Sequence, residues 1–198
     1  MRTASIIINA IIFVTTIIIL ILCFRKDGTW RIRPGLKAFR FFTVLSNALC
    51  ATAALMMAVS QLGGAVPRLV LLMKYLGTVS VTVTLLTVFL FLGPSAGGYR
   101  ELLSGDNLYM HLIGPLLAIL SFCLLEKRRM AFGTAMTGLL PVLLYGMLYL
   151  YKVVFAPEDR RWEDFYGFNK GGKWPISYGA MIAGTAIVCV VFWLVCRM

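Results

Sequence analysis

Two polar side chains in apolar surroundings are the strongest candidates for chemistry in this sequence. His111, the only histidine of the chain, stands five residues after Asp106, and Thr43 stands near the start of an uncharged stretch, 41–62. A threonine hydroxyl is a weak nucleophile that needs an adjacent base to take its proton. Histidine suits that role because its imidazole exchanges a proton near neutral pH. The pair indicates nucleophilic catalysis if the fold brings the two side chains together.

Thr43 belongs to a polar stripe on an otherwise apolar helix. Thr43, Ser46, Asn47 and Cys50 are spaced i, i+3, i+4 and i+7, a spacing that places them on one helical face. Beside a nucleophile, Asn47 or Ser46 can donate a hydrogen bond to a developing oxyanion. We therefore treat both as candidate oxyanion or orienting groups.

The histidine also has candidate partners close by in the sequence. Asn107 lies four residues before His111, on the same helical face, and Asp106 comes just before Asn107. Because a base needs a fixed ring orientation, we expect Asn107, or else Asp106, to hold the imidazole. Rising by about 1.5 Å per residue from the same surface, Thr43 and His111 are expected at similar shallow depth.

A third group of residues is expected to wall a pocket near Thr43. Tyr145, Tyr149 and Lys152 share a helical face that ends on the Thr43 side, and an aromatic loop, 162–169, follows. The loop can close over a pocket mouth, or its rings can form the aromatic belt that membrane proteins place at the lipid headgroups.

Each candidate also has a purely structural interpretation. Threonine in a membrane helix commonly bonds back to its own backbone, and Ser46 and Asn47 can join helices. A lone interfacial histidine is commonly a packed, hydrogen-bonded side chain. A second stripe, Lys74, Thr78 and Thr82, indicates helix packing rather than a conduction path.

The composition places these residues in a membrane protein. The chain has 198 residues, of which 60% are hydrophobic, and a mean hydropathy of +0.87, well above ordinary soluble domains. Its net charge of +11 comes from basic residues between the apolar runs, where they act as headgroup anchors. This distribution argues against nucleic-acid binding. The five cysteines lie in apolar runs without a second histidine, so no metal site is predicted.

Six apolar stretches are long enough to cross about 30 Å of hydrocarbon. Lipid leaves bare backbone groups unsatisfied, so these stretches must be helices. Short connections make consecutive helices antiparallel neighbours. The sequence therefore predicts an all-α, polytopic membrane protein, residues 1–198 forming a single compact domain. The expected helices are 5–24, 41–62, 69–92, 107–125, 131–151 and 175–196.

The basic residues also predict an orientation in the membrane. The first, third and fifth connections carry twelve Lys and Arg residues, against seven on the other face. By the positive-inside rule this places those three connections, and with them Thr43 and His111, on the cytoplasmic side. For a bacterial chain the membrane would be the cell membrane.

Two short motifs resemble a known family. The stretches Phe42-Thr43-Val44-Leu45-Ser46-Asn47 and Met110-His111-Leu112-Ile113-Gly114-Pro115 are similar to motifs of the androgen-induced protein family, which includes the androgen-dependent TFPI-regulating protein. The chain resembles a bacterial-type relative. Members are multi-pass membrane hydrolases that cleave fatty acid esters of hydroxy fatty acids. The resemblance implies Thr43 as nucleophile and His111 as its base.

Together these observations predict an intramembrane lipid-ester hydrolase of that type. The expected partners are a lipid ester that arrives from the bilayer and the surrounding membrane lipids, and the chemistry implies neither a metal ion nor an organic cofactor. A membrane acyltransferase using the same dyad, a small transporter and a non-catalytic scaffold are the alternatives. The oligomeric state is left open.

Overall fold

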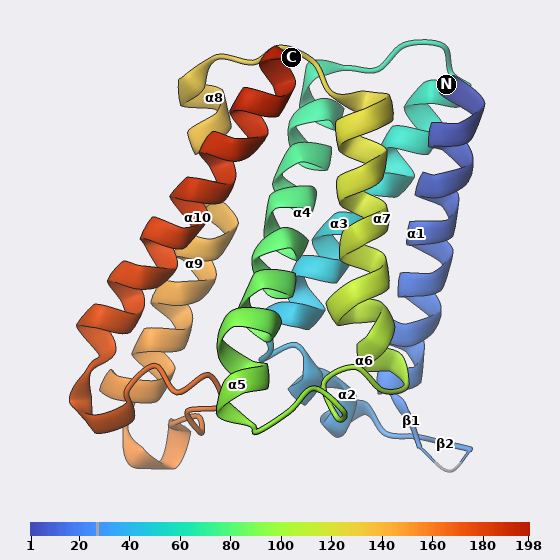
Figure 1. Cartoon of the computed structure of the whole chain (residues 1–198). Helices are drawn as coiled ribbons and strands as arrows, with labels where there is room; N and C mark the ends of the chain where they lie inside the picture. Colours follow the sequence, from blue (N-terminus) through green and yellow to red (C-terminus); the bar gives the residue numbers. More distant parts are fainter. Residues whose placement is uncertain (27) are drawn as a thin grey trace.

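The chain forms a bundle of membrane-spanning helices. The computed structural model describes residues 1–26 and 28–198. Within these residues six helices are long and apolar enough to cross a membrane, which makes this a multi-pass membrane protein, as predicted. Both termini lie at the same end of the bundle (Figure 1). The spans are Arg2–Cys23, Phe42–Leu62, Arg68–Ser95, Asp106–Glu126, Phe132–Phe155 and Trp174–Arg197.

Several spans are built from consecutive helical segments, some of which are wide π turns. The α-helices are α1 (Arg2–Cys23), α2 (Ile32–Ala38), α3 (Phe42–Leu62), α4 (Arg68–Thr87), α5 (Gly93–Ser95), α6 (Asp106–Leu108), α7 (Gly114–Ser121), α8 (Phe132–Met136), α9 (Leu139–Leu150) and α10 (Trp174–Arg197). The π turns are Val88–Leu92, Tyr109–Ile113, Phe122–Glu126 and Tyr151–Phe155, and 3-10 turns are at Glu158–Arg160 and Lys170–Gly172. Two short strands, β1 (Arg25–Lys26) and β2 (Thr29–Trp30), pair antiparallel.

The fifth span differs most from its predicted form. It continues to Phe155 instead of ending at Tyr151, because Lys152 does not stop the helix: its amine lies 5.9 Å from the centre of the Tyr151 ring, where a long side chain can reach the headgroups. The same span is interrupted between α8 and α9. Pro141 causes this break, since proline has no N–H to donate to the carbonyl of Thr137.

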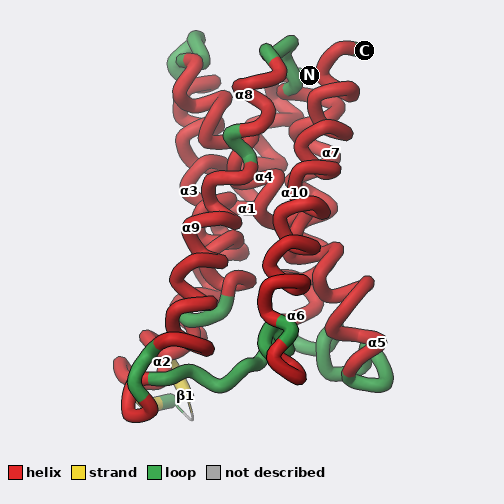
Figure 2. Tube along the Cα trace, turned by 90° about the vertical axis from the view of Figure 1, so that its left-hand side faces the viewer, coloured by secondary structure: helices red, strands yellow, loops and turns green. Residues whose placement is uncertain are grey.

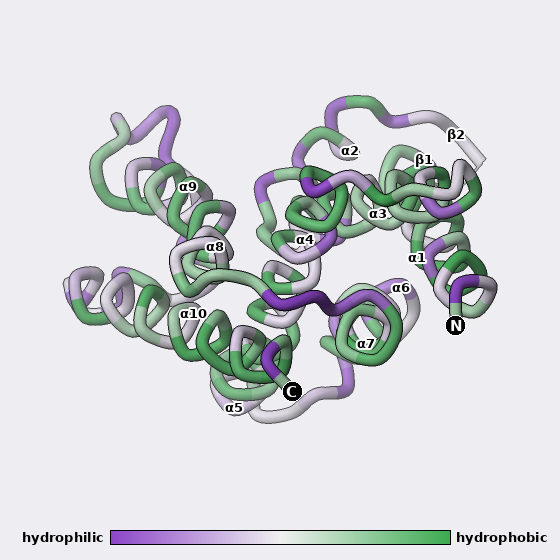
Figure 3. Tube along the Cα trace, turned by 90° about the horizontal axis from the view of Figure 1, so that it is seen from above, coloured by the Kyte–Doolittle hydropathy of each residue, from purple (hydrophilic) through white to green (hydrophobic). Residues whose placement is uncertain are grey.

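The helices form two groups that share α4. α1, α3, α4 and α7 pack together, and α8, α9 and α10 pack on the other side of α4, as the view from above shows (Figure 3). α3 and α4 approach closely because Gly77 has no side chain: a Cβ there would lie 2.9 Å from the Cα of Cys50. Apolar side chains such as Leu144 and Ile187 are 69% and 64% exposed. Such residues face lipid, while the interior holds the polar groups.

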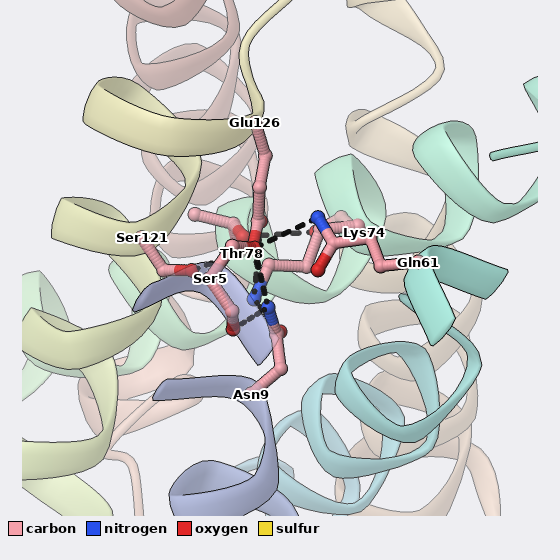
Figure 4. A network of polar contacts seen from close by, with 7 residues as sticks. All are labelled: Ser5, Asn9, Gln61, Lys74, Thr78, Ser121 and Glu126. Atoms are coloured by element: carbon pink, nitrogen blue, oxygen red, sulfur yellow. Dashed lines mark hydrogen bonds and ion pairs between the residues drawn. The ribbon is translucent and has the colours of Figure 1, made fainter. Parts of the chain in front are cut away.

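A buried polar network joins the first group near the termini (Figure 4). Lys74 of α4 and Glu126, which ends the fourth span, form an ion pair of 3.5 Å with both side chains fully buried. Oε1 of Glu126 accepts hydrogen bonds from Ser5 at 2.5 Å, from Ser121 at 2.7 Å and from Asn9. The Lys74 amine donates to Oδ1 of Asn9 at 2.6 Å. Each charge therefore has an opposite charge and polar partners, which a charge in lipid requires.

The network extends to α3 and includes the predicted lysine stripe. Gln61 donates to the Ser5 hydroxyl at 2.9 Å, so α1, α3, α4 and the fourth span are all linked. Thr78 and Thr82 each donate back to a carbonyl one turn earlier in α4. In this second stripe the two threonines therefore bond to their own helix, and Lys74 is paired with Glu126.

The opposite end of the bundle carries the longer loops (Figure 2). These are the connections before α3, between α5 and α6, and between the fifth span and α10. Thr43 lies in the first turn of α3, and His111 lies just inside the start of the fourth span, so both lie at this loop-rich end.

Candidate functional site

His111 is positioned by a wide helical turn. The π turn Tyr109–Ile113 surrounds it, and the N–H of Gly114 bonds to the carbonyl of Tyr109 five residues earlier. Pro115 follows and has no N–H for the carbonyl of His111, so the ladder is already broken at this point. Gly114 also suits this turn, because a Cβ there would lie 3.1 Å from the Tyr109 carbonyl oxygen, which is a tight contact. π turns of this kind are frequent at functional sites.

The structure brings Thr43 and His111 together. The Thr43 hydroxyl lies 3.3 Å from Nε2 of His111, although the residues come from different spans. The imidazole is buried, with 7% of the residue exposed. This separation is within the range over which a hydroxyl passes its proton to a base when a substrate tightens the contact.

A backbone carbonyl fixes the ring. Nδ1 of His111 lies 2.7 Å from the carbonyl oxygen of Leu102, which accepts hydrogen bonds and never donates them. Nδ1 therefore carries the proton, and Nε2, the nitrogen that faces Thr43, has a free lone pair. The imidazole is held in the tautomer that a general base needs.

The predicted orienting residues do not perform that role. Asn107 donates instead to the carbonyl of Glu101 at 3.3 Å, which ties the start of the fourth span to the preceding loop. Asp106 borders the cavity in front of His111. The loop that supplies Leu102 turns back over the histidine, and its carbonyl takes the position that the sequence assigned to a side chain.

The predicted oxyanion donors are also engaged elsewhere. The amide of Asn47 donates to the carbonyls of Thr43 and Met110, at 2.8 and 3.0 Å. The hydroxyl of Ser46 lies 3.1 Å from the Thr43 carbonyl and 2.8 Å from the hydroxyl of Thr84. Both side chains hold helices together beneath Thr43. They hold Thr43 in place, and their hydrogen bonds leave them no free donor for a substrate oxygen.

A tyrosine from the aromatic loop occupies the position that Asn47 and Ser46 do not reach. The hydroxyl oxygen of Tyr166 accepts the N–H of Phe42 at 3.0 Å, beside Thr43 at the N-terminus of α3. Burial raises the pKa of Tyr166, against the opposing effect of hydrogen bonds with Phe42, Tyr145 and Thr43. Tyr166 therefore keeps its proton and remains a hydrogen-bond donor.

A carboxylate fixes the loop that carries Tyr166. Asp164 accepts the N–H groups of Phe168 and Asn169 at 2.8 and 2.7 Å and the hydroxyl of Tyr149 at 3.0 Å. The Tyr149 oxygen in turn accepts the N–H of Tyr166 at 3.0 Å. The rings of this loop pack on α9. A loop that covers a site was one of the two sequence interpretations, but the Tyr166 hydroxyl as a part of the site was not predicted.

Two cavities meet at Thr43. The first, which we call the narrow slot, has a volume of about 80 Å³ and lies among α4, α9 and α10, where Thr87, Val142 and Met181 line it. The second, the wide chamber, has a volume of about 670 Å³ and lies at the loop-rich end of the bundle, where Ala96, Asp106 and His111 line it. Thr43, Leu92 and Tyr166 line both cavities. The candidate nucleophile thus lies in the wall that the two cavities share.

The three predicted pocket residues divide. Tyr145 and Tyr149 line the narrow slot, and the Tyr145 hydroxyl donates to the carbonyl of Arg40 at 2.7 Å. Lys152 is absent from both cavity walls among the described residues. Its side chain turns outward over Tyr151, because the amine gains hydration at the membrane surface.

Comparison of the chain with protein-family models, with curated proteins and with solved structures gives no match. The arrangement around Thr43 must therefore be interpreted from its own geometry.

Proposed function

We propose that the protein is an intramembrane hydrolase of lipid esters that uses Thr43 as nucleophile and His111 as general base. One observation carries the proposal: the Thr43 hydroxyl lies 3.3 Å from Nε2 of His111 while the Leu102 carbonyl holds the proton on Nδ1. This is the nucleophile, base and orienter arrangement of covalent hydrolases, with a carbonyl as the third member. The family resemblance of the two motifs agrees with it and suggests fatty acid esters of hydroxy fatty acids as the first substrates to try.

The reaction follows from the positions of these groups. Nε2 of His111 takes the hydroxyl proton as the Thr43 oxygen attacks the ester carbonyl carbon, which forms a tetrahedral intermediate. Collapse of this intermediate breaks the bond to the alcohol oxygen, which leaves with the proton from His111 and gives an acyl-threonine. Water then attacks the acyl group through the same base, which releases the fatty acid and restores Thr43.

The negative charge that develops on the carbonyl oxygen has a candidate donor. The Tyr166 hydroxyl accepts from Phe42 and is hydrogen-bonded with the Thr43 and Tyr145 side chains, so a small rotation would turn its proton toward an oxyanion formed at Thr43. Thr43 also lies in the first turn of the 21-residue helix α3, whose N-terminus carries partial positive charge. Both features stabilise charge at the place where the reaction creates it.

We expect Tyr166→Phe to lower kcat by about 10²-fold with little change in KM, because it removes one donor to the oxyanion and keeps the aromatic packing. Steady-state hydrolysis of one ester by the purified protein in detergent measures this. Glu163→Gln is the control in the same loop and should retain kcat, because Glu163 is exposed and lines neither cavity. Equal activity of Tyr166→Phe and the wild type would remove Tyr166 from the mechanism.

The nucleophile itself is tested by covalent labelling. A fluorophosphonate probe should label the wild type in detergent micelles and leave Thr43→Ala unlabelled, while Thr43→Ser should be labelled. Thr52→Ala is the control, because Thr52 is an exposed residue of the same helix that donates back to the carbonyl of Ala48. Equal labelling of Thr43→Ala and the wild type would contradict the assignment. Transport or scaffolding roles predict the same result for both proteins.

A further inference from the structure

The two cavities at Thr43 differ in ways that match the two parts of a lipid ester. The narrow slot lies within three membrane spans, and its wall is mostly apolar, with Val83, Val142 and Met181 beside Thr84 and Thr87. The wide chamber lies at the loop-rich end of the bundle, where apolar side chains such as Ile19 and Met110 form much of its wall and Asp106, Asn107 and His111 add a carboxylate, an amide and an imidazole. An acyl chain that comes from the bilayer keeps an apolar environment in the slot, while a polar alcohol finds charged and hydrogen-bonding groups in the chamber.

From this difference, and resting on the proposed function, we propose that the ester lies across Thr43 with its acyl chain in the narrow slot and its alcohol in the wide chamber. Thr43, which lines both cavities together with Tyr166 and Leu92, then meets the carbonyl at the boundary. The slot thus selects the acyl chain, and the chamber selects the leaving alcohol.

The slot has a definite depth. Along α9 its lining runs from Tyr149, near Thr43, to Val142, which is seven residues, or about 10 Å of helix. Val142 is buried, with 2% exposed, and lies at the far end of the slot. On the side wall, a Cβ at Gly146 would lie 2.5 Å from the terminal methyl group of Met181. The Met181 side chain thus packs directly on Gly146, and the two residues together form that part of the wall.

The chamber carries one formal charge of its own. Among the described residues that line the chamber, Asp106 is the one acidic residue, and there is no lysine or arginine. A carboxylate at this position disfavours an alcohol that carries a second carboxylate, since like charges at close range repel. Because Asp106 is exposed and its charge is screened by water, we expect it to slow esters of hydroxy acids only moderately and not to exclude them from the site.

The placement is tested by changing each cavity separately. Straight-chain p-nitrophenyl esters that differ only in acyl length report the slot, through kcat/KM. Val142→Phe should shift the preference to shorter chains, with a loss of about tenfold or more for the longest ester. Val142→Ala should shift it to longer chains. Opposite shifts from one position also guard against a variant that merely folds poorly.

The chamber variants provide the matched controls. Ala96→Phe places a larger side chain in the chamber and not in the slot, so it should leave the acyl-length preference unchanged. Asp106→Asn should raise kcat/KM several-fold for the ester of one fatty acid with a hydroxy acid, relative to its ester with a neutral alcohol. Two results would overturn the placement and leave the proposed function standing. In one, hydrolysis depends on Thr43 but the acyl-length preference is unchanged in both Val142 variants. In the other, Ala96→Phe changes that preference instead. Absence of Thr43-dependent hydrolysis would overturn the proposed function itself.

Discussion

The double variant Thr43→Ala/His111→Gln is expected to hydrolyse esters no more slowly than either single variant, each of which should lose about 10³-fold or more in kcat. The reason is that Thr43 and His111 act as one unit. Once the hydroxyl is absent, a base at 3.3 Å has no proton to take, and once the base is absent the hydroxyl stays a weak nucleophile. The measurement is a double-mutant cycle on kcat with one ester, in one detergent.

Additive losses in this cycle would show that the two residues act independently, which excludes a nucleophile and base pair. Thr52→Ala again provides the control, because Thr52 is exposed and lines neither cavity, and its replacement should keep kcat. His111→Gln is preferred to alanine since an amide can retain the hydrogen bond to the Leu102 carbonyl and so preserve the loop.

The second large effect is expected at the other end of the bundle, on stability. Lys74→Met should lower the free energy of unfolding by about 3–5 kcal/mol, because it leaves the carboxylate of Glu126 buried without its positive partner. The double variant Lys74→Met/Glu126→Leu removes both charges and should recover most of that loss. Unfolding in mixed detergent micelles, followed by circular dichroism, gives the comparison.

Lys127→Met is the matched control for this prediction. Lys127 is the neighbour of Glu126 in the sequence but is exposed, with one hydrogen bond to the carbonyl of Val195, so its replacement should cost no more than about 0.5 kcal/mol. If Lys74→Met unfolds like the wild type, the ion pair does not contribute to holding the four helices together.

Most of the architecture was predictable because long apolar runs allow only one structure in lipid. The positions that resisted prediction are those where local and distant effects compete. The predicted fourth helix ends at residue 125, which puts Glu126 in the following loop beside Lys127, Arg128 and Arg129. In the structure it ends the fourth span and turns inward to Lys74. Nothing in the sequence near Glu126 signals this partner, which lies 52 positions earlier.

The site was predictable to a different degree. The histidine and threonine stood out because polar residues are costly in a membrane span, and the structure places them within 3.3 Å. The group that orients the ring was not predictable, because a backbone carbonyl such as that of Leu102 has no signature in the sequence. Tyr166 was hidden among other aromatic residues, and only the hydrogen bonds of Asp164 show why this tyrosine faces Thr43.

The position of the polar network has a mechanical consequence. It clamps α1, α3, α4 and the fourth span in one leaflet, and the hydroxyl of Tyr75 on α4 adds a bond to the Ala135 carbonyl of α8 at the same level. In the other leaflet, van der Waals contact alone joins α4 to α9 and α10 within the described part of the chain. Among the described residues, no ion pair joins α4 to α9 or α10 in this second leaflet, so the proposed entry of a lipid tail between these helices would not have to separate opposite charges.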